Sequence, residues 1–206
     1  MCSIVGSYSK TKFLELIKLN TYRGAFSHSL TIIKPDRYEV YKGFGPFNND
    51  LFNTEFYEEG DYILGHCQAP TNGLVQEFDR IHPYQGKVAL LHNGIIKDAE
   101  VGRINCELGT EYIWDTQALA EYIQDDFTKL SEIEGSFACG CIKGNELFVF
   151  RNAISPLYMD SEANLSSTKF LNSNMVENNA IYQLDIKNKV YNKVSEFNNT
   201  HNPYYF

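Results

Sequence analysis

The residue with the most direct chemical potential is the second in the chain. Cys2 follows the initiator Met, and because Cys is small the Met is normally removed, which leaves Cys as the first residue of the mature chain. A terminal Cys carries a thiol and an α-amino group together, and the amine, with an ordinary pKa of about 8, can accept the thiol proton. The position therefore predicts a nucleophile with its own base. The alternative is a small apolar residue that opens a strand.

Asn93 and Gly94 form the second candidate group, directly after an apolar run at 87–92. An amide side chain and a glycine N–H can point at one oxygen, as stabilisation of a tetrahedral oxyanion requires. Glycine also lets a ligand approach the backbone closely. However, Asn-Gly is equally the strongest two-residue hairpin signal, with Ile95 and Ile96 as the return strand.

A third group follows another apolar run, where Gly65-His66 leads into a segment rich in Pro, Asn and Gly and then into His82-Pro83. Sites commonly lie where a strand end and a loop present polar groups to a pocket. A histidine in such a position is also often a hydrogen-bonded structural residue. Both interpretations of His66 and His82 stay open at this point.

The elements that must position these groups are mostly strands. Apolar and β-branched runs predict strands over residues 3–8, 30–33, 38–41, 62–67, 87–92, 137–142, 146–151, 181–186 and 189–194. Helical spacing predicts helices over 12–20 and 115–130, the second capped by Asp115 or Thr116. Hairpins interleaved with helices predict packed antiparallel sheets covered by helices in one domain, 1–206. Residues from about 171 to 206 are expected to form a terminal hairpin and tail, with 198–206 as the surface tail.

Composition narrows the classes of partner. The 206 residues are 43% hydrophobic, and 18 Lys and Arg against 26 Asp and Glu give a net charge of −8. Nucleic-acid and anionic-membrane binding are disfavoured because both need a positive field. No apolar run approaches the roughly 20 residues of a membrane span, and the N-terminus lacks a secretory pattern. With five Cys, an odd number, we expect free thiols and a cytoplasmic location.

No metal or organic cofactor is predicted. Cys139 and Cys141 are two residues apart on a predicted strand, so they face the same side, and this is not the spacing of a metal-binding Cys pair. Cys67 and Cys106 are expected to be small core or surface residues.

Seven segments in this order resemble the class II glutamine amidotransferases, the glutaminase domains whose nucleophile is the N-terminal residue. The segments are Cys2-Ser3-Ile4-Val5-Gly6, Tyr22-Arg23-Gly24 with Ser27-His28-Ser29, Gly65-His66 through Thr71 and Gly73, His82-Pro83, His92-Asn93-Gly94, Asp115-Thr116, and Gly135-Ser136-Phe137 with Arg151-Asn152 and Ser155-Pro156-Leu157. Each motif is common alone, but seven in one order are specific. They cover the chain from residue 2 to about 170.

The resemblance implies a fold and a reaction. The fold would be α+β, a four-layer αββα sandwich of two stacked antiparallel sheets. Cys2 would attack the side-chain amide carbon of glutamine, and its α-amine would take the thiol proton and pass it to the departing ammonia. Asn93 and the Gly94 N–H would hold the oxyanion, and hydrolysis of the thioester would release glutamate.

The resemblance also implies substrate-binding residues. Asp115 would pair with the α-ammonium of glutamine, or else only cap its helix. Thr71 and His82 would shape the pocket. Arg23 would support the nucleophile, or else form a surface ion pair of little energetic value.

One position departs from the family pattern. Gln68 stands where the family has the Arg that grips the substrate α-carboxylate, and losing a charged fork for a neutral amide weakens binding by about 1–3 kcal/mol. Arg80 is the first candidate for a replacement cation. Three alternatives to a replacement cation are weak binding that improves when a partner docks, a substrate that is not free glutamine, and an impaired site.

The expected partner is a separate synthase or ligase subunit that accepts the ammonia through a protected path. Two alternatives stay open. The chain could be a catalytically impaired binding or regulatory subunit of the same fold, or an N-terminal-Cys hydrolase of another amide.

Overall fold

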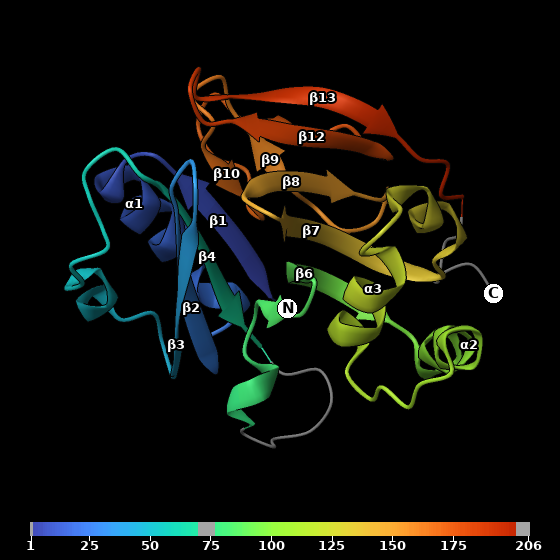
Figure 1. Cartoon of the computed structure of the whole chain (residues 1–206). Coiled ribbons are helices and arrows are strands. Elements are labelled where there is room, and N and C mark those ends of the chain that lie inside the picture. The colour runs from blue at the N-terminus through green and yellow to red at the C-terminus, as the bar shows by residue number, and fades with distance from the viewer. Residues whose placement is uncertain (1, 70–76, 201–206) are drawn as a thin grey trace.

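The computed structural model describes residues 2–69 and 77–200 and contains two antiparallel sheets (Figure 1). The first sheet has the strand order β11 (Asn174–Met175), β9 (Tyr158–Met159), β10 (Leu165–Ser166), β1 (Ser3–Ser7), β4 (Tyr62–Gln68), β2 (Ser27–Ile33) and β3 (Tyr38–Phe44). The second has the order β13 (Val190–Glu196), β12 (Ala180–Asp185), β8 (Glu146–Arg151), β7 (Gly135–Lys143), β6 (Val88–Ile96) and β5 (Tyr84–Gln85).

Helices cover the outer face of each sheet. The α-helices are α1 (Lys10–Asn20), α2 (Asp98–Leu108) and α3 (Asp115–Ile123), and the 3₁₀ turns are η1 (Thr21–Arg23), η2 (Asn49–Phe52), η3 (Phe78–Arg80) and η4 (Phe127–Glu132). Figure 1 shows α1 against the first sheet, and α2 and α3 against the second.

Alternation of side chains along each strand produces three separate cores. In β4, Ile63 packs with α1, whereas Leu64 faces the second sheet. In β6, Leu91 faces the first sheet, whereas Leu90 packs with α2 and α3. One core lies between the sheets and one under each helical layer, so the predicted four-layer αββα sandwich of stacked antiparallel sheets is confirmed.

The helix predictions need two corrections. The predicted helix 115–130 ends at Ile123, because Asp126 caps a new turn by accepting the Thr128 N–H at 2.8 Å. Helix α2 was not predicted, because its buried apolar positions are few. It nevertheless carries end signals, namely an acidic first turn and Gly109 in the left-handed conformation after its last residue.

The Asn-Gly pair at 93–94 is not a turn. Strand β6 runs through it to Ile96 and pairs with β7 along its whole length, from Val88 opposite Lys143 to Ile96 opposite Gly135. The hairpin interpretation is therefore wrong. Pairing with β7 through this position outweighs the local turn preference.

The predicted surface tail from residue 198 also needs correction at its start. Asn199 is buried, and its Nδ2 donates to the carbonyls of Leu130 and Ile133 at 2.8 Å each. These two bonds attach the segment that follows β13 to the turn η4 and to the residue directly after it. Residues 201–206 lie outside the described part.

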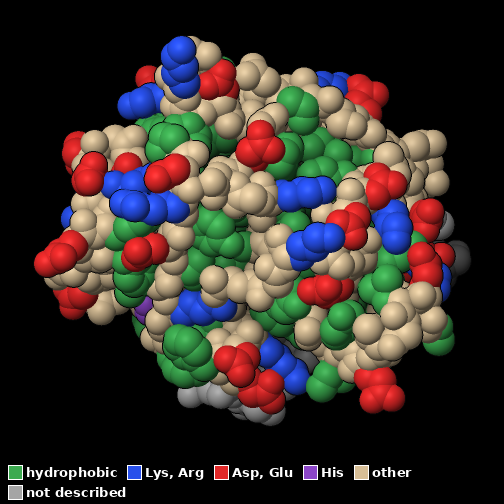
Figure 2. All heavy atoms as spheres, in the orientation of Figure 1, with side chains coloured by type: hydrophobic (Ala, Val, Ile, Leu, Met, Phe, Trp, Pro, Cys, Tyr) green, Lys and Arg blue, Asp and Glu red, His purple; other side chains and the backbone are tan. Residues whose placement is uncertain are grey.

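The surface carries both signs of charge. Figure 2 shows Lys and Arg side chains lying beside Asp and Glu side chains across one face of the molecule. Within the two described ranges, no helix is long and apolar enough to cross a membrane.

Candidate active site

Cys2 lies at the start of β1, at one end of the space between the sheets. Side chains alternate along the strand, so Cys2 points to the same face as Ile4, which belongs to the core between the sheets. The thiol donates to the Ala69 carbonyl at 3.5 Å. Burial raises the pKa of the Cys2 thiol, and the negative charge of Asp115 acts in the same direction. The thiol is therefore protonated near neutral pH, and a base must take its proton when the sulfur attacks.

Ser167 connects the Cys2 strand to Asn93. Its Oγ accepts the Ile4 N–H at 2.9 Å and the Asn93 Nδ2 at 3.3 Å, while its own N–H donates to the Ile4 carbonyl at 2.9 Å. Strands β1 and β6 lie in contact across the two sheets. One hydroxyl thus holds the Asn93 amide next to the strand that begins with the nucleophile.

Gly94 occupies a position with no room for a side chain. A Cβ there would lie 1.9 Å from the Ser136 carbonyl oxygen and 2.8 Å from the His92 Nε2. The close approach of β6 and β7 therefore requires glycine at position 94. The backbone N–H of this residue lies next to Asn93 at the site.

Asp115 ties the start of α3 to the end of β6. Its Oδ1 accepts the Thr116 N–H at 2.7 Å and its Oδ2 accepts the Ile96 N–H at 3.2 Å. The side chain keeps 16% of its surface exposed, so it is available to a ligand. The predicted cap is not the observed arrangement, since Trp114 occupies the N-cap position of α3 and makes no side-chain cap.

Three buried histidines lie between the sheets and α3. His66 Nε2 contacts the His92 carbonyl at 3.2 Å, and His92 Nε2 contacts the Ser136 carbonyl at 3.1 Å. A carbonyl only accepts, so both rings carry their proton on Nε2. The Thr116 hydroxyl contacts His92 Nδ1 at 3.2 Å and His82 Nε2 at 3.0 Å, and it lies within donating distance of Asp115 Oδ1 at 3.4 Å.

Two of the three histidines, His66 and His82, are neutral. The His66 and His82 rings stack with centroids 4.0 Å apart, and their Nδ1 atoms have no partner among the described residues. Burial lowers the pKa of His66 to about 3 and holds the pKa of His82 well below 6.5. His66 and His82 therefore pack the floor of the site without adding charge.

Gln68 sits beside Cys2 at the end of β4. The antiparallel register pairs Ser3 with Cys67, and continuing it by one residue sets Gln68 opposite Cys2 on the same face. The Ser27 hydroxyl donates to Gln68 Oε1 at 2.7 Å. The amide of Gln68 is thus held in a defined orientation at the edge of the site.

The two predicted arginines lie in different settings. Arg23 is buried, and its Nε donates to the Cys2 carbonyl at 2.9 Å, so it orients the backbone of the nucleophile. The alternative of a surface ion pair for Arg23 is wrong. Arg80 lies on η3, where its Nε contacts Glu77 Oε2 at 2.6 Å.

Thr71 lies outside the described residues. Two residues that the sequence analysis did not assign to the site are Ser167 and Thr116, each of which joins two elements through one hydroxyl. A serine at the end of a short strand carries no sequence signal for such a role. Among the described residues, no group of three or more His, Cys, Asp and Glu side chains is arranged to hold a metal ion.

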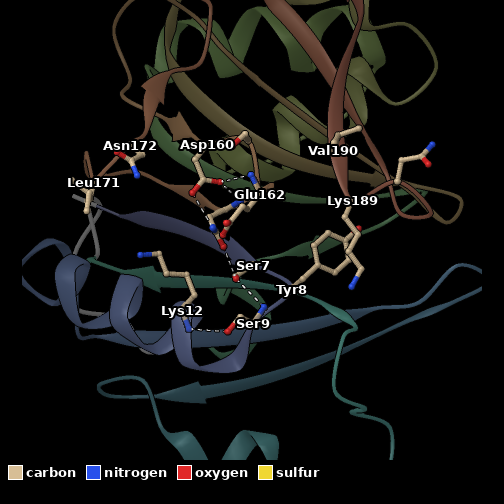
Figure 3. Close-up of a pocket in the computed structure, with 13 residues that line it drawn as sticks. Ser7, Tyr8, Ser9, Lys12, Asp160, Glu162, Leu171, Asn172, Lys189 and Val190 are labelled. Carbon is tan, nitrogen blue, oxygen red and sulfur yellow. Dashed lines mark hydrogen bonds between the residues drawn. The ribbon is translucent and has the colours of Figure 1, made fainter.

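A separate hollow lies at the other end of β1. This cavity of about 620 Å³ is lined by residues that include Ser7, Lys12 and Asp160 (Figure 3). At its edge, Ser7 Oγ donates to Asn164 Oδ1 at 2.6 Å. Five residues of strand place it roughly 16 Å from Cys2. It is therefore not part of the candidate active site.

Comparison with solved structures places this architecture among known folds. The glutamine phosphoribosylpyrophosphate amidotransferase of B. subtilis superposes on 94% of this chain with a TM-score of 0.67 and 16% identity, and the match covers 49% of that protein. A structure described as the allosteric regulatory enzyme of purine biosynthesis gives a TM-score of 0.70, 17% identity and the same 94% coverage, over 48% of its own length. The chain has the fold of the N-terminal-nucleophile amidotransferases.

Sequence comparison gives curated relatives. The glutamine–fructose-6-phosphate aminotransferase (isomerizing) of Staphylococcus aureus is 29% identical over 185 residues, which cover 77% of this chain and 30% of that protein. The Helicobacter pylori protein of the same name is 26% identical over 220 residues, covering 91% of this chain and 37% of its own length. No protein-family model matches the sequence. Within the fold class, the chain is a homologue of the class II glutamine amidotransferases, and it spans little more than a third of these relatives at most.

Proposed function

We propose that the chain hydrolyses the side-chain amide of a glutamine substrate through a thioester on Cys2. The observation that carries the proposal is that the Ser167 hydroxyl joins Asn93 of the second sheet to Ile4 of the first, two residues after Cys2 and on the same face of its strand. A buried thiol, an amide donor and a partly exposed carboxylate at one end of the sandwich are the groups that this chemistry needs.

The reaction begins with attack on the amide carbon. After removal of Met1, the Cys2 α-amine takes the thiol proton as the sulfur bonds to the δ-carbon of the substrate, and the carbonyl oxygen becomes an oxyanion. The Asn93 Nδ2 and the Gly94 N–H stabilise that oxyanion. The carbon–nitrogen bond of the substrate then breaks, and the protonated α-amine of Cys2 returns its proton to the departing ammonia.

Water completes the cycle. The α-amine activates a water molecule, which attacks the thioester carbon, and the carbon–sulfur bond breaks to release a carboxylate and regenerate the thiol. A self-supplied base fits this site because burial raises the pKa of the Cys2 thiol, so no thiolate is present in advance. Asp115 binds the α-ammonium of the substrate during both steps.

The remaining predicted residues have supporting roles in this proposal. Arg23 positions the Cys2 backbone through the bond to its carbonyl. His82 forms the floor of the pocket together with His66. Gln68 contacts the α-carbonyl end of the substrate.

The test compares two cysteine variants of the purified protein. Loss of Met1 is first checked by intact mass, and ammonia release is measured from glutamine and from a glutaminyl dipeptide. Cys2→Ala is expected to abolish release from both, whereas Cys106→Ala, on the exposed face of α2, retains it. Activity that survives Cys2→Ala, or that is equal in a chain retaining Met1, would contradict the proposal.

We further propose that the ammonia is consumed by a synthase or ligase site on a separate subunit. Ammonia that escapes into water is protonated and lost as a nucleophile, which favours direct transfer between docked partners. The relatives support transfer of the nitrogen to an acceptor, since they are named as glutamine–fructose-6-phosphate aminotransferases. A purified chain that works at its full rate, unaffected by any co-expressed partner, would count against it.

A further inference from the structure

The site presents one charged and one neutral polar group beside the nucleophile. Asp115 offers a carboxylate, and Gln68 offers an amide. Their chemistry defines what the substrate must carry at the two positions around its α-carbon.

The backbone of Gln68 is fixed by its neighbours. Its carbonyl accepts the Phe26 N–H at 3.0 Å. The backbone of Gly24 packs so closely that a Cβ there would lie 2.5 Å from the Gln68 carbonyl carbon. The next residue, Ala69, accepts the Cys2 thiol, so the end of β4 cannot move without disturbing the nucleophile.

The side chain of Gln68 is oriented as well. Ser27 is almost fully buried and donates to Oε1, so the remaining polar atom of the amide is Nε2, a donor without a hydrogen-bond partner among the described residues. A neutral N–H donor is matched by a neutral carbonyl oxygen. It does not supply the charge-assisted fork that a carboxylate requires.

The cations around the site are already engaged. All 18 Lys and Arg of the chain fall within the described ranges, since residues 1, 70–76 and 201–206 contain none. Three lie on elements next to the site: Arg23 is bonded to the Cys2 carbonyl, Lys42 Nζ donates to the Pro83 carbonyl at 2.8 Å, and Arg80 pairs with Glu77.

Free glutamine therefore fits this arrangement poorly. Its α-ammonium pairs with Asp115, but its α-carboxylate then meets a neutral amide near another negative charge. A substrate whose α-carboxylate is replaced by an amide keeps the ammonium contact and gives Gln68 Nε2 a neutral acceptor. The repulsion between the two carboxylates disappears as well.

We propose that the preferred substrate is a glutamine unit with a free α-amino group and an uncharged, amide-linked α-carbonyl, such as the first residue of a peptide. This inference rests on the proposed function, because it assumes attack by Cys2 on the side-chain amide. It assigns Gln68 as the residue that determines specificity at the α-carbonyl.

The experiment compares three substrates with the Met1-processed protein: glutamine, glutamine α-amide and glutaminylglycinamide. The deamidated products are identified by mass spectrometry. We expect kcat/KM to be about tenfold higher for the two amides than for free glutamine, the difference between a matched and an unmatched polar contact. A higher kcat/KM for free glutamine would overturn the inference while leaving the proposed function intact, whereas no Cys2-dependent hydrolysis of any substrate would overturn both.

Two substitutions of Gln68 test its role. Gln68→Arg supplies a charged fork and is expected to reverse the preference toward free glutamine. Gln68→Met keeps the length but removes the amide, and it is expected to lower kcat/KM about tenfold for the amide substrates only. A substrate ratio that stays constant in both folded variants would overturn the assignment.

Arg80→Ala tests the alternative to this inference, in which Arg80 binds the α-carboxylate in place of the missing arginine. An equal effect on glutamine and on its α-amide supports the inference. If the KM for glutamine alone rises about tenfold, Arg80 binds the α-carboxylate after all, and the inference is overturned.

Discussion

At the scale of single residues, the Ser167 hydroxyl restrains Asn93, the side chain proposed to stabilise the oxyanion, without being one of the reacting groups. Ser167 receives hydrogen bonds from Asn93 of one sheet and from Ile4 of the other. Asn93 is therefore restrained in orientation before any substrate arrives, and a preorganised donor costs no reorganisation when the oxyanion forms. Ser167 acts through Asn93 and is a positioning residue.

Substitution of Asn93 and Ser167 should separate a direct role from an indirect one. Asn93→Ala is expected to lower kcat by about 10²–10³, the usual effect of removing one oxyanion donor. Ser167→Ala is expected to lower kcat by only about tenfold with little change in KM, because the donor remains but is less well oriented. Steady-state kinetics on the preferred substrate measures both effects.

Ser166→Ala is the matched control for these variants. Ser166 stands next to Ser167 in β10 but bonds to Asn20 Nδ2 at 2.8 Å, on the α1 side of the sheet. Its loss should reduce stability and leave kcat unchanged. Equal kcat values for the two serine variants would refute the positioning role of Ser167.

At the scale of elements, the continuity of β6 decides the geometry of the site. Asn93 and Gly94 occupy a central strand that is paired with β7 on one side and, further back, with β5 on the other. The alternation of that strand turns Asn93 toward the first sheet and leaves Gly94 against Ser136. A hairpin at this point would have removed both groups from the site.

Two glycine variants test the packing of these elements. Gly94→Ala would push a methyl group into the Ser136 carbonyl, and we expect a loss of about 1–3 kcal/mol in the free energy of unfolding. Gly102→Ala meets nothing within 4 Å on helix α2, and we expect a gain of about 0.5–1 kcal/mol from the higher helix propensity of alanine. Urea unfolding measures both, and a Gly94→Ala protein as stable as the wild type would show that β6 and β7 can separate locally.

At the scale of the complete fold, the histidine cluster connects the layers of the sandwich. His66 comes from the first sheet, His92 from the second, and Thr116 from the helical layer. Burial keeps His66 and its stacked neighbour His82 neutral, because a charged ring would need a proton on an Nδ1 that has no acceptor among the described residues. The cluster therefore makes the stability of the fold sensitive to acid.

The direction of that sensitivity follows from linkage. His66 stays neutral in the folded protein down to a pKa of about 3, whereas in the unfolded chain it takes a proton below about 6.5. Its contribution to stability is therefore complete above pH 6.5 and is lost as the pH falls toward 3. His82 acts in the same direction. We expect the free energy of unfolding to fall by about 1.4 kcal/mol per pH unit for each such histidine in this window.

The variant His66→Gln tests whether His66 causes this dependence of stability on pH. The glutamine amide can still donate to the His92 carbonyl but cannot take up a proton, so the dependence of stability on pH should become shallower by about one proton between pH 6 and pH 4. Denaturant unfolding at a series of pH values measures the slope. Identical slopes for the two proteins would mean that His66 is not protonated on unfolding.

Local patterns along the chain were enough to indicate the reactive groups and most of the strands. Cys2 and Asn93 could be singled out because their residue types and positions suit one reaction, whereas Asp115 was assigned only through the family resemblance. Most strands could be predicted because alternation is a local property. Helix α2 and the true end of α3 were missed, since their few buried positions and the Asp126 cap compete with weak local signals.

The way these groups meet depends on contacts between distant parts of the chain. Ser167 reaches Ile4 across 163 residues of sequence, and Gln68 receives its orientation from Ser27 across 41. Such contacts depend on which strands become neighbours and which face each strand turns inward, and both are consequences of burying three cores at once. Local sequence cannot encode them, because each partner comes from a segment far away in the chain that only folding brings near.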